Sequence, residues 1–295
     1  MLARLAPALF VVVWSTGFIV ARFAAPHAAP ELVLLARMIL TAALLAAVAT
    51  LRREAWPVGK PFGMQLVAGL LLNGLYLCTS WWAISKGMPA GIMALLGALQ
   101  PLVVAVASFL FLGERLSRRA WLGLGVGLGG VVLVLGPLLE RSAAAVVPWY
   151  VVAGSATSIL AMAAGTMIQR GALANDGVFV SGAIQNAGGA AIALAATVLL
   201  GDFHWDNSPA LWGALIWSVV MLSAGALTLL VWMTRRQGAT RVSILLLLVP
   251  PLAALEAWLL FGERLGVLQL LGFCLALGGV LLARTASRAV APEPA

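Results

Sequence analysis

Ten long apolar runs constrain the fold of this chain more than any other feature of its sequence. Each is long enough to cross about 30 Å of hydrocarbon at about 1.5 Å of helix rise per residue. Charged residues make up only 9% of the chain, whereas soluble domains hold about a quarter. The runs lie near residues 5–25, 30–51, 63–85, 90–112, 118–138, 146–168, 177–200, 209–233, 240–261 and 266–283. We therefore expect an all-α membrane protein with ten transmembrane helices.

One stretch of the chain occurs twice. Residues 101–131 and 250–280 match without a gap at 13 of 31 positions, including a proline, a Gly-Glu-Arg-Leu corner and a Gly-Gly-Val triplet. Apolar sequences match readily at Leu and Ala, but not at a polar corner with the same spacing to a proline. We expect two homologous halves. The first five-helix repeat is predicted in residues 1–142, the second in 143–284, and a cytoplasmic tail in 285–295.

Basic residues indicate the orientation of the chain. Cytoplasmic segments of membrane proteins carry an excess of Lys and Arg. With both termini in the cytoplasm, the inner segments hold 13 basic residues and the outer ones four, with Arg37 inside a helix. An odd number of spans in each half then makes the second half inverted relative to the first. Inverted repeats are typical of secondary transporters, in which two equivalent halves expose a midplane site alternately to each side.

The repeated motifs resemble a known family. The Gly-Glu-Arg-Leu corner after a proline-containing helix, the Gly-Gly-Val triplet, and Pro30 and Arg37 in the stretch PELVLLAR look like the ten-helix exporters of the drug/metabolite transporter superfamily. Among these exporters, the tryptophan-rich chain is most similar to those of aromatic and hydrophobic amino acids. The resemblance implies an inner-membrane carrier in which helices 1–4 and 6–9 surround a cavity and helices 5 and 10 are peripheral.

Two ionisable residues lie inside the apolar runs, at similar depth from the outer side. Arg37 is seven residues into the second helix, about 10 Å deep, and Glu256 is five residues before the end of the ninth, about 8 Å deep. Intramembrane ionisable groups mark transport pathways. Arg37 could receive a substrate carboxylate, and Glu256 could carry a coupling proton. Alternatively the two form a structural ion pair, or Arg37 extends its charged end toward the outer surface.

Polar and aromatic side chains within the helices are the other candidates for substrate binding. They can hydrogen-bond or stack on a ligand in the cavity, or they can serve only to join helices. The candidates are Trp14 and Ser15 in the first helix, Asn73, Tyr76 and Ser80 in the third, Gln185 and Asn186 in the seventh, and Trp217 in the eighth. Glycines 123 and 127 form a small-residue face that indicates close helix packing, within the chain or in a homodimer. Cys78 and Cys274 are expected to be buried thiols.

The function favoured by these patterns is export of small amphiphilic metabolites, most of all amino acids including aromatic ones, by alternating access. Exporters of another metabolite or drug class, facilitated or proton-coupled, remain alternatives, and a membrane-embedded enzyme is a weaker one because catalytic metal or nucleophile motifs are missing from the sequence. We expect no catalytic residues, no metal, no cofactor and no nucleic-acid partner. The expected partners are a small-molecule substrate and the lipid bilayer, with the chain a monomer or a homodimer.

Overall fold

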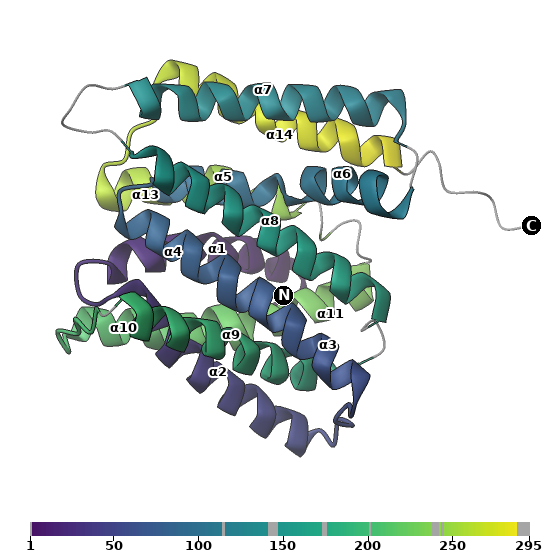
Figure 1. Ribbon diagram of the computed structural model, residues 1–295, viewed down its shortest axis with the longest axis vertical. Coiled ribbons are helices and arrows are strands. Elements are labelled where there is room, and N and C mark those ends of the chain that lie inside the picture. Colours follow the sequence, from purple (N-terminus) through teal and green to yellow (C-terminus); the bar gives the residue numbers. More distant parts are fainter. Residues whose placement is uncertain are drawn as a thin grey trace, which may run out of the picture.

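The computed structural model describes residues 2–113, 116–140, 147–172, 176–200, 202–237, 242 and 245–287. All named elements in these ranges are helical (Figure 1). The first half holds α1 (Leu2–Ala24), α2 (Pro30–Leu51), α3 (Lys60–Gly69), the π-helix η1 (Leu70–Leu75), α4 (Tyr76–Ser85), α5 (Ala90–Ala98), α6 (Gln100–Leu112) and α7 (Arg118–Glu140). The second holds α8 (Trp149–Ala172), α9 (Val178–Leu200), α10 (Pro209–Trp217), the π-helix η2 (Ser218–Ala226), α11 (Leu227–Gln237), α13 (Val249–Phe261) and α14 (Val267–Ser287).

Eight helical segments of the described chain are long and apolar enough to cross a membrane. They coincide with the first eight predicted runs, since α3, η1 and α4 form one span, α5 and α6 another, and α10, η2 and α11 a third. Two shorter apolar helices, Val249–Phe261 and Val267–Ala283, occupy the last two runs. Part of the predicted run 240–261 lies outside the described residues, as do the predicted boundary at 142–143 and the tail from residue 288.

Equivalent helices of the two halves carry the same irregularities. A π-helical segment interrupts the third span at η1 and the eighth at η2. A break precedes Pro101 in the fourth span, at Leu99, and a turn at Leu248 precedes Pro250 in the ninth. Proline causes both breaks because it lacks a backbone N–H and restricts the residue before it. The predicted span over residues 90–112 is thus present as Ala90–Phe111, divided into α5 and α6 at Leu99.

A left-handed glycine ends each of the two helices that begin with the repeated proline, α6 and α13. Gly113 follows α6 with φ 67°, and Gly262 follows α13 with φ 68°. Glycine adopts this conformation without the strain that a Cβ would add. The repeated glycine corner therefore marks a structural turn that both halves share. Glu114 and Arg115 lie outside the described residues.

The last helices of the two halves, α7 and α14, pack side by side at one edge of the bundle (Figure 1). A Cβ on Gly123 would lie 2.6 Å from the backbone nitrogen of Ala283, and a Cβ on Gly130 would meet Ala276. As the residue number increases along α7, the residue number of the contacting position in α14 decreases. The two equivalent helices therefore run antiparallel, as expected for inverted halves. The small-residue face of α7 thus packs within the chain.

The two cysteines differ in environment. Cys78 on α4 is buried, as expected, but Cys274 on α14 is exposed. The expectation of a buried thiol is therefore wrong for Cys274. The reason is that α14 packs mainly on α7 and leaves much of its own surface uncovered at the edge of the bundle.

Candidate functional site

A cavity of about 610 Å³ lies between the two halves. Residues of α1, α2, the α3–η1–α4 span, α5 and α6 form its wall on one side. Residues of α8, α9, η2, α11 and the start of α13 form the other side, and none of the described residues that line it belongs to α7 or α14. The fifth and tenth predicted helices, which are α7 and α14 in the structure, are thus peripheral, as the sequence resemblance implied.

Arg37 lies on the cavity wall, about two turns into α2. Its guanidinium carbon is 5.8 Å from the centre of the Trp81 ring on α4, within the range of a cation–π contact. The Tyr76 phenol is close enough to interact with it electrostatically. No described carboxylate oxygen lies within 4.0 Å of the guanidinium. The wall therefore presents a positive charge without an ionic partner beside an aromatic face.

Side-chain amides form a chain of hydrogen bonds at one end of the cavity. Gln169 donates to Gln185 at 3.0 Å, and Gln185 donates to Gln65 at 2.7 Å. The Gln65 amide nitrogen in turn donates to Asp176 at 2.7 Å and to Ser181 at 2.8 Å. Gln65 is fully buried, and a buried amide that lacked partners would cost stability. The chain of amides joins α3 of the first half to α8 and α9 of the second. We call this end of the bundle the amide end.

Glycines let α3 and α9 cross closely beside these amides. A Cβ on Gly69 would overlap the backbone of Gln185, and a Cβ on Gly188 would lie 2.6 Å from the carbonyl oxygen of Leu66. Small residues at membrane helix crossings allow such close backbone approach. The crossing therefore positions the Gln185 side chain next to Gln65.

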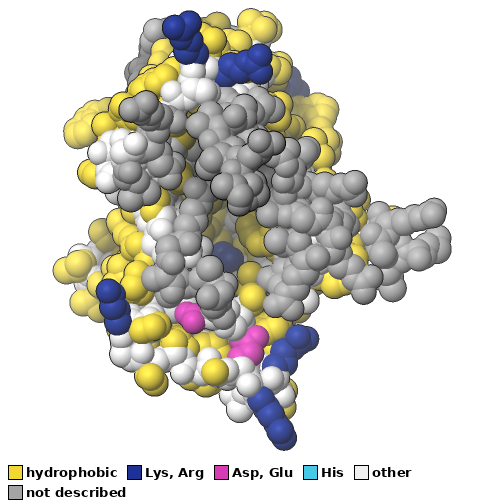
Figure 2. Space-filling model, turned by 90° about the vertical axis from the view of Figure 1, so that its right-hand side faces the viewer, with side chains coloured by type: hydrophobic (Ala, Val, Ile, Leu, Met, Phe, Trp, Pro, Cys, Tyr) yellow, Lys and Arg dark blue, Asp and Glu magenta, His cyan; other side chains and the backbone are white. Residues whose placement is uncertain are grey.

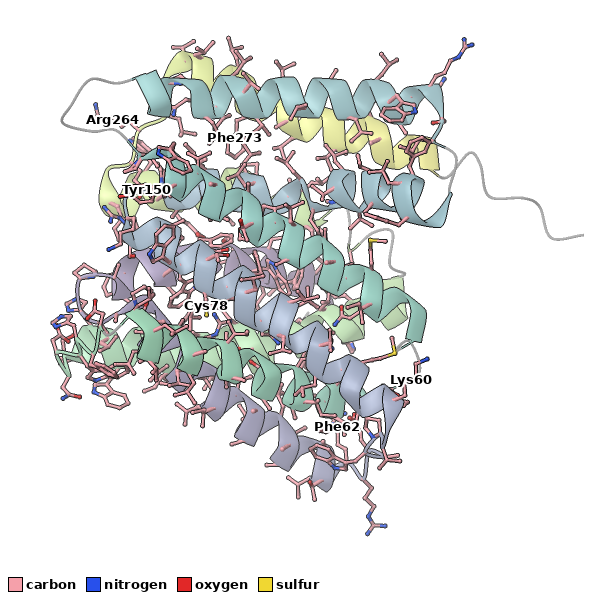
Figure 3. All side chains as sticks on the ribbon, viewed as in Figure 1. Lys60, Phe62, Cys78, Tyr150, Arg264 and Phe273 are labelled. Carbon is pink, nitrogen blue, oxygen red and sulfur yellow. The ribbon has the colours of Figure 1, made fainter. Side chains whose placement is uncertain are left out.

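The loops at 25–29, 86–89, 202–208 and 262–266 meet at the opposite end, which we call the latch end. Figure 3 shows Arg264 and Tyr150 toward this end, and Lys60 and Phe62 at the amide end. An isolated antiparallel bridge joins Ala28 to Trp205. The backbone nitrogen of Asp206 donates to the carbonyl oxygen of His27 at 3.0 Å. These contacts close the bundle between its two halves at the latch end.

Asp206 also pairs with His27 through its side chain, at 2.6 Å between Oδ2 and Nδ1. The backbone N–H of Ser208 donates to Oδ1 at 2.8 Å. Hydrogen bonds to the ionised form favour it. The Ser208 bond, and after it the His27 bond, lower the pKa of Asp206 to about 2. Asp206 therefore stays ionised, and able to hold His27, over the whole physiological range of pH.

A second cross-half contact of the latch end involves Glu263. Its Oε1 lies 3.5 Å from Nε of Arg22 at the end of α1. Its Oε2 accepts from the backbone nitrogen of Ala90, the first residue of α5, at 3.0 Å. Burial raises the pKa of Glu263, while the Ala90 bond and the Arg22 charge lower it by less. The two carboxyl groups of the latch end thus have pKa values shifted in opposite directions.

Six of the predicted residues line the cavity. They are Trp14, Arg37, Asn73, Tyr76, Gln185 and Asn186. The Asn186 amide donates to the carbonyl oxygen of Gly182 in its own helix at 2.8 Å, and Gln185 belongs to the amide chain. The two amides thus line the cavity and also make bonds that hold the helices.

Three predicted substrate-binding residues lie outside the cavity wall. Ser15 is buried and bonds to Glu256. Ser80 is buried and donates to the carbonyl oxygen of Tyr76 at 2.6 Å. Trp217 is exposed and donates from its indole to Thr16 at 2.9 Å. These positions do not favour direct contact of the three side chains with a ligand in the cavity.

The expected ion pair between Arg37 and Glu256 is not formed. Glu256 lies against α1, where its Oε1 is 2.7 Å from the hydroxyl of Ser15, and Arg37 lies against Trp81 instead. Similar depth in the membrane allowed the two residues to meet, but they are on faces of α2 and α13 that have different neighbours. Arg37 lines the cavity, and Glu256 does not.

Sequence reasoning missed several cavity residues. Gln65, Gln169, Asp176 and Ser181 all line the cavity and belong to the amide chain. One local signal was present, because Ser181 and Gln185 are four residues apart and share a helix face. The partners of Gln65 are more than 100 residues away in the sequence, so no local pattern could pair them.

The described lining of the cavity is made of polar, basic, aromatic and apolar side chains. Within the described ranges, no group of three His, Cys, Asp or Glu side chains is placed to hold a metal ion. The cavity instead combines one basic group, several amides and aromatic rings.

Apolar helices that could cross a membrane, arranged as two related halves around a cavity closed at one end, define a multi-pass membrane transporter. The chain belongs to the EamA-like transporter family, whose model matches residues 2–136 and again residues 149–285. A solved structure titled "Crystal structure of protein" is 22% identical, with a TM-score of 0.62 over 97% of this chain and 98% of that one. That likeness shows the fold alone. A search of curated proteins found no match.

Proposed function

We propose that this chain is a secondary transporter that exports small amphiphilic carboxylates, above all amino acids including aromatic ones, by alternating access. The observation that carries the proposal is Arg37, a guanidinium on the cavity wall without an ionic partner among the described residues. A buried charge without a partner is costly, and a substrate carboxylate would compensate it. Family membership supports the transporter class but not the substrate.

The surroundings of Arg37 support a ligand with an apolar or aromatic body. Trp14, Phe18 and Tyr76 line the same cavity. Aromatic rings stack on one another or on aliphatic side chains with favourable energy. Asn73 and Asn186 offer amide oxygens to an ammonium group. Among the described lining residues the sole carboxylate is Asp176, at the amide end, so a purely cationic ligand would meet no counter-charge beside Arg37.

The two ends of the bundle support an alternating-access cycle. The cavity extends from Arg37 toward Asp176 at the amide end, whereas the contacts of the latch end close it on the other side. Figure 2 looks onto the amide-end face and shows Lys and Arg side chains around it. Exposed basic residues of that end are Arg52, Arg53, Lys60, Arg118 and Arg119. In our proposal this end is cytoplasmic, the termini lie on that side, ten helices span an inner membrane, and the structure is the inward-facing state.

The test is transport by the purified protein in liposomes. Phenylalanine and 3-phenylpropanoate carry a carboxylate, whereas phenylethylamine has the same ring without one. We expect uptake of phenylalanine in exchange for internal phenylalanine, weaker uptake of 3-phenylpropanoate, and none of phenylethylamine. Arg37→Gln should lower carboxylate transport at least about tenfold, which corresponds to the loss of one charge-assisted contact.

The matched control is Arg52→Gln, which removes an exposed arginine at the amide end and should leave transport unchanged. If phenylethylamine moves as fast as phenylalanine and Arg37→Gln has no effect, the carboxylate assignment is wrong, and an exporter of another metabolite or drug class remains. If no substrate of the panel moves, the amino-acid proposal fails as a whole.

A further inference from the structure

Ser15 of α1 and Glu256 of α13 form a partly buried contact between the two halves, outside the cavity. The Ser15 hydroxyl lies 2.7 Å from Oε1 of Glu256 and 2.8 Å from the carbonyl oxygen of Val12, one turn earlier in α1. The other carboxyl oxygen of Glu256, Oε2, is buried and has no hydrogen-bond partner. Ser15 itself is 1% exposed.

The number of protons available to these two short contacts indicates whether the Glu256 carboxyl group is ionised or protonated. The serine hydroxyl carries one proton, but two acceptor oxygens lie within reach of it. If Glu256 were ionised, Ser15 could satisfy only one of them, and a membrane-buried carboxylate would hold its charge on a single hydrogen bond. If Glu256 carries a proton on Oε1, it donates to Ser15, and Ser15 donates to Val12. Only the protonated acid satisfies both short contacts at once.

Among the described side chains of the neighbouring helices, no charged group compensates an ionised Glu256. The helices packed against α13 are α1 and α5. Residues of α5, Ala90–Ala98, include no titratable side chain. In α1 the described titratable side chain is Arg22, which pairs with Glu263; the side chain of Arg4, near the far end of α1, lies outside the described ones. An uncompensated charge inside a membrane is expensive, which agrees with the proton count.

The contact shares one interface with the latch end. Ser15 and Arg22 are seven residues apart on α1, about two helical turns, and so lie on the same face of that helix. Their partners are Glu256 on α13 and Glu263 in the loop that follows α13. Because α1 and α13 belong to different halves, opening the latch end between them separates both pairs and admits water to Glu256.

We propose that Glu256 is a proton-binding site whose occupancy is linked to the closed latch end. Closing the α1–α13 interface binds one proton on the Glu256 carboxyl group, and opening it releases that proton to water. The inference rests on the proposed alternating-access function for its opening step, but not for the protonation itself. A rise in pH then favours the open latch end, and a fall in pH favours the closed one.

Infrared difference spectroscopy tests the protonation without any substrate. At about neutral pH the wild-type protein should show a protonated carboxyl C=O band that is missing in Glu256→Gln. The same band should shift in Ser15→Ala, because its hydrogen-bond acceptor is removed. Ser15→Ala keeps the carboxyl group, so it tests the site even if Glu256→Gln folds poorly. A wild-type band that neither variant changes would overturn the proposal.

Spin-label distances across the latch end test the linkage. Labels on exposed Lys86 and Asp202 report the separation of the two halves at that end. The ratio of closed to open states should fall by up to about tenfold per pH unit once the open state releases the proton. Glu256→Gln, which mimics the protonated acid, should stay closed across that range. Glu263→Gln is the control for the other carboxyl group of the interface, and it should keep the pH dependence.

The outcomes separate this inference from the proposed function. A pH-independent distance in the wild type, or an unchanged pH dependence in Glu256→Gln, would contradict the linkage even if transport occurs. Failure to transport any carboxylate would contradict the proposed substrate class, while the infrared band and the distances would still decide the proton site.

Discussion

The two ends of the bundle join the same two halves by different chemistry. The latch end uses titratable side chains and loop backbone, namely the His27–Asp206 and Arg22–Glu263 pairs and the Ala28–Trp205 bridge. The amide end uses side-chain amides centred on Gln65, which bond to one another, to Ser181 and to the single carboxyl group of Asp176, next to the close crossing of α3 and α9. Water competes with exposed ion pairs, which are therefore weak, whereas buried amides lose more when a partner is removed. The latch end should thus be the end that is easier to open.

The largest expected effect is at the helix crossing of the amide end. In Gly69→Leu, the new side chain would overlap the backbone of Gln185 and force α3 away from α9. We expect a loss of about 3 kcal/mol or more in the free energy of unfolding, because overpacking that moves backbone is costly. Thermal unfolding in detergent, followed by tryptophan fluorescence, measures it. Gly213→Leu on α10 is the control, since its Cβ would point into open space. Equal effects of the two substitutions would show that the crossing is not tightly packed.

The helices of this bundle could be predicted from the sequence, but most side-chain partnerships could not. Apolar runs are long enough to identify the spans, and the repeated Gly113 and Gly262 corners indicate the two halves. Where nearly every position is apolar, however, periodicity does not reveal how each helix is rotated about its axis. For this reason the sequence could place Arg37 within an apolar span, which is α2 in the structure, but it could not identify Ser15 as the partner of Glu256.

A smaller effect is expected when Gln65, the residue at the centre of the amide chain, is replaced. Gln65→Leu removes the hydrogen bonds to Asp176, Ser181 and Gln185 and leaves their polar groups without that partner. We expect a loss of about 2 kcal/mol in the free energy of unfolding, the usual cost of an unsatisfied buried group. Chemical denaturation in detergent measures the change. Thr157→Val removes an exposed hydroxyl that bonds only within its own helix and should change little.

At the latch end, the loss of an ion pair should change the equilibrium between closed and open states more visibly than the free energy of unfolding. Glu263→Gln or Arg22→Gln removes a partly exposed ion pair between α1 and the loop after α13. Such pairs contribute less than about 1 kcal/mol, which still changes an equilibrium between closed and open states by up to about fivefold. Spin labels on Lys86 and Asp202 should then show a larger population with the longer label-to-label distance. The control is Arg264→Gln, an exposed neighbour of Glu263. The comparison of the two ends is wrong if Gln65→Leu opens the latch end more than Glu263→Gln does.

The smallest expected effect is a difference in pH dependence between the two carboxyl groups of the latch end, Glu263 and Asp206. Burial raises the pKa of Glu263, so its carboxylate is protonated at a higher pH than an ordinary glutamate, and its attraction to Arg22 is lost first as the pH falls. Asp206 has its pKa lowered to about 2 by the Ser208 and His27 bonds. Its stabilising contribution is present above the unfolded-state value of about 3.9 and is lost as the pH falls through the folded-state value. The difference in unfolding free energy between wild type and Arg22→Gln should therefore vanish at a higher pH than the difference between wild type and Asp206→Asn. Denaturation series at several pH values measure both differences, and the opposite order would refute the assignment of the two shifts.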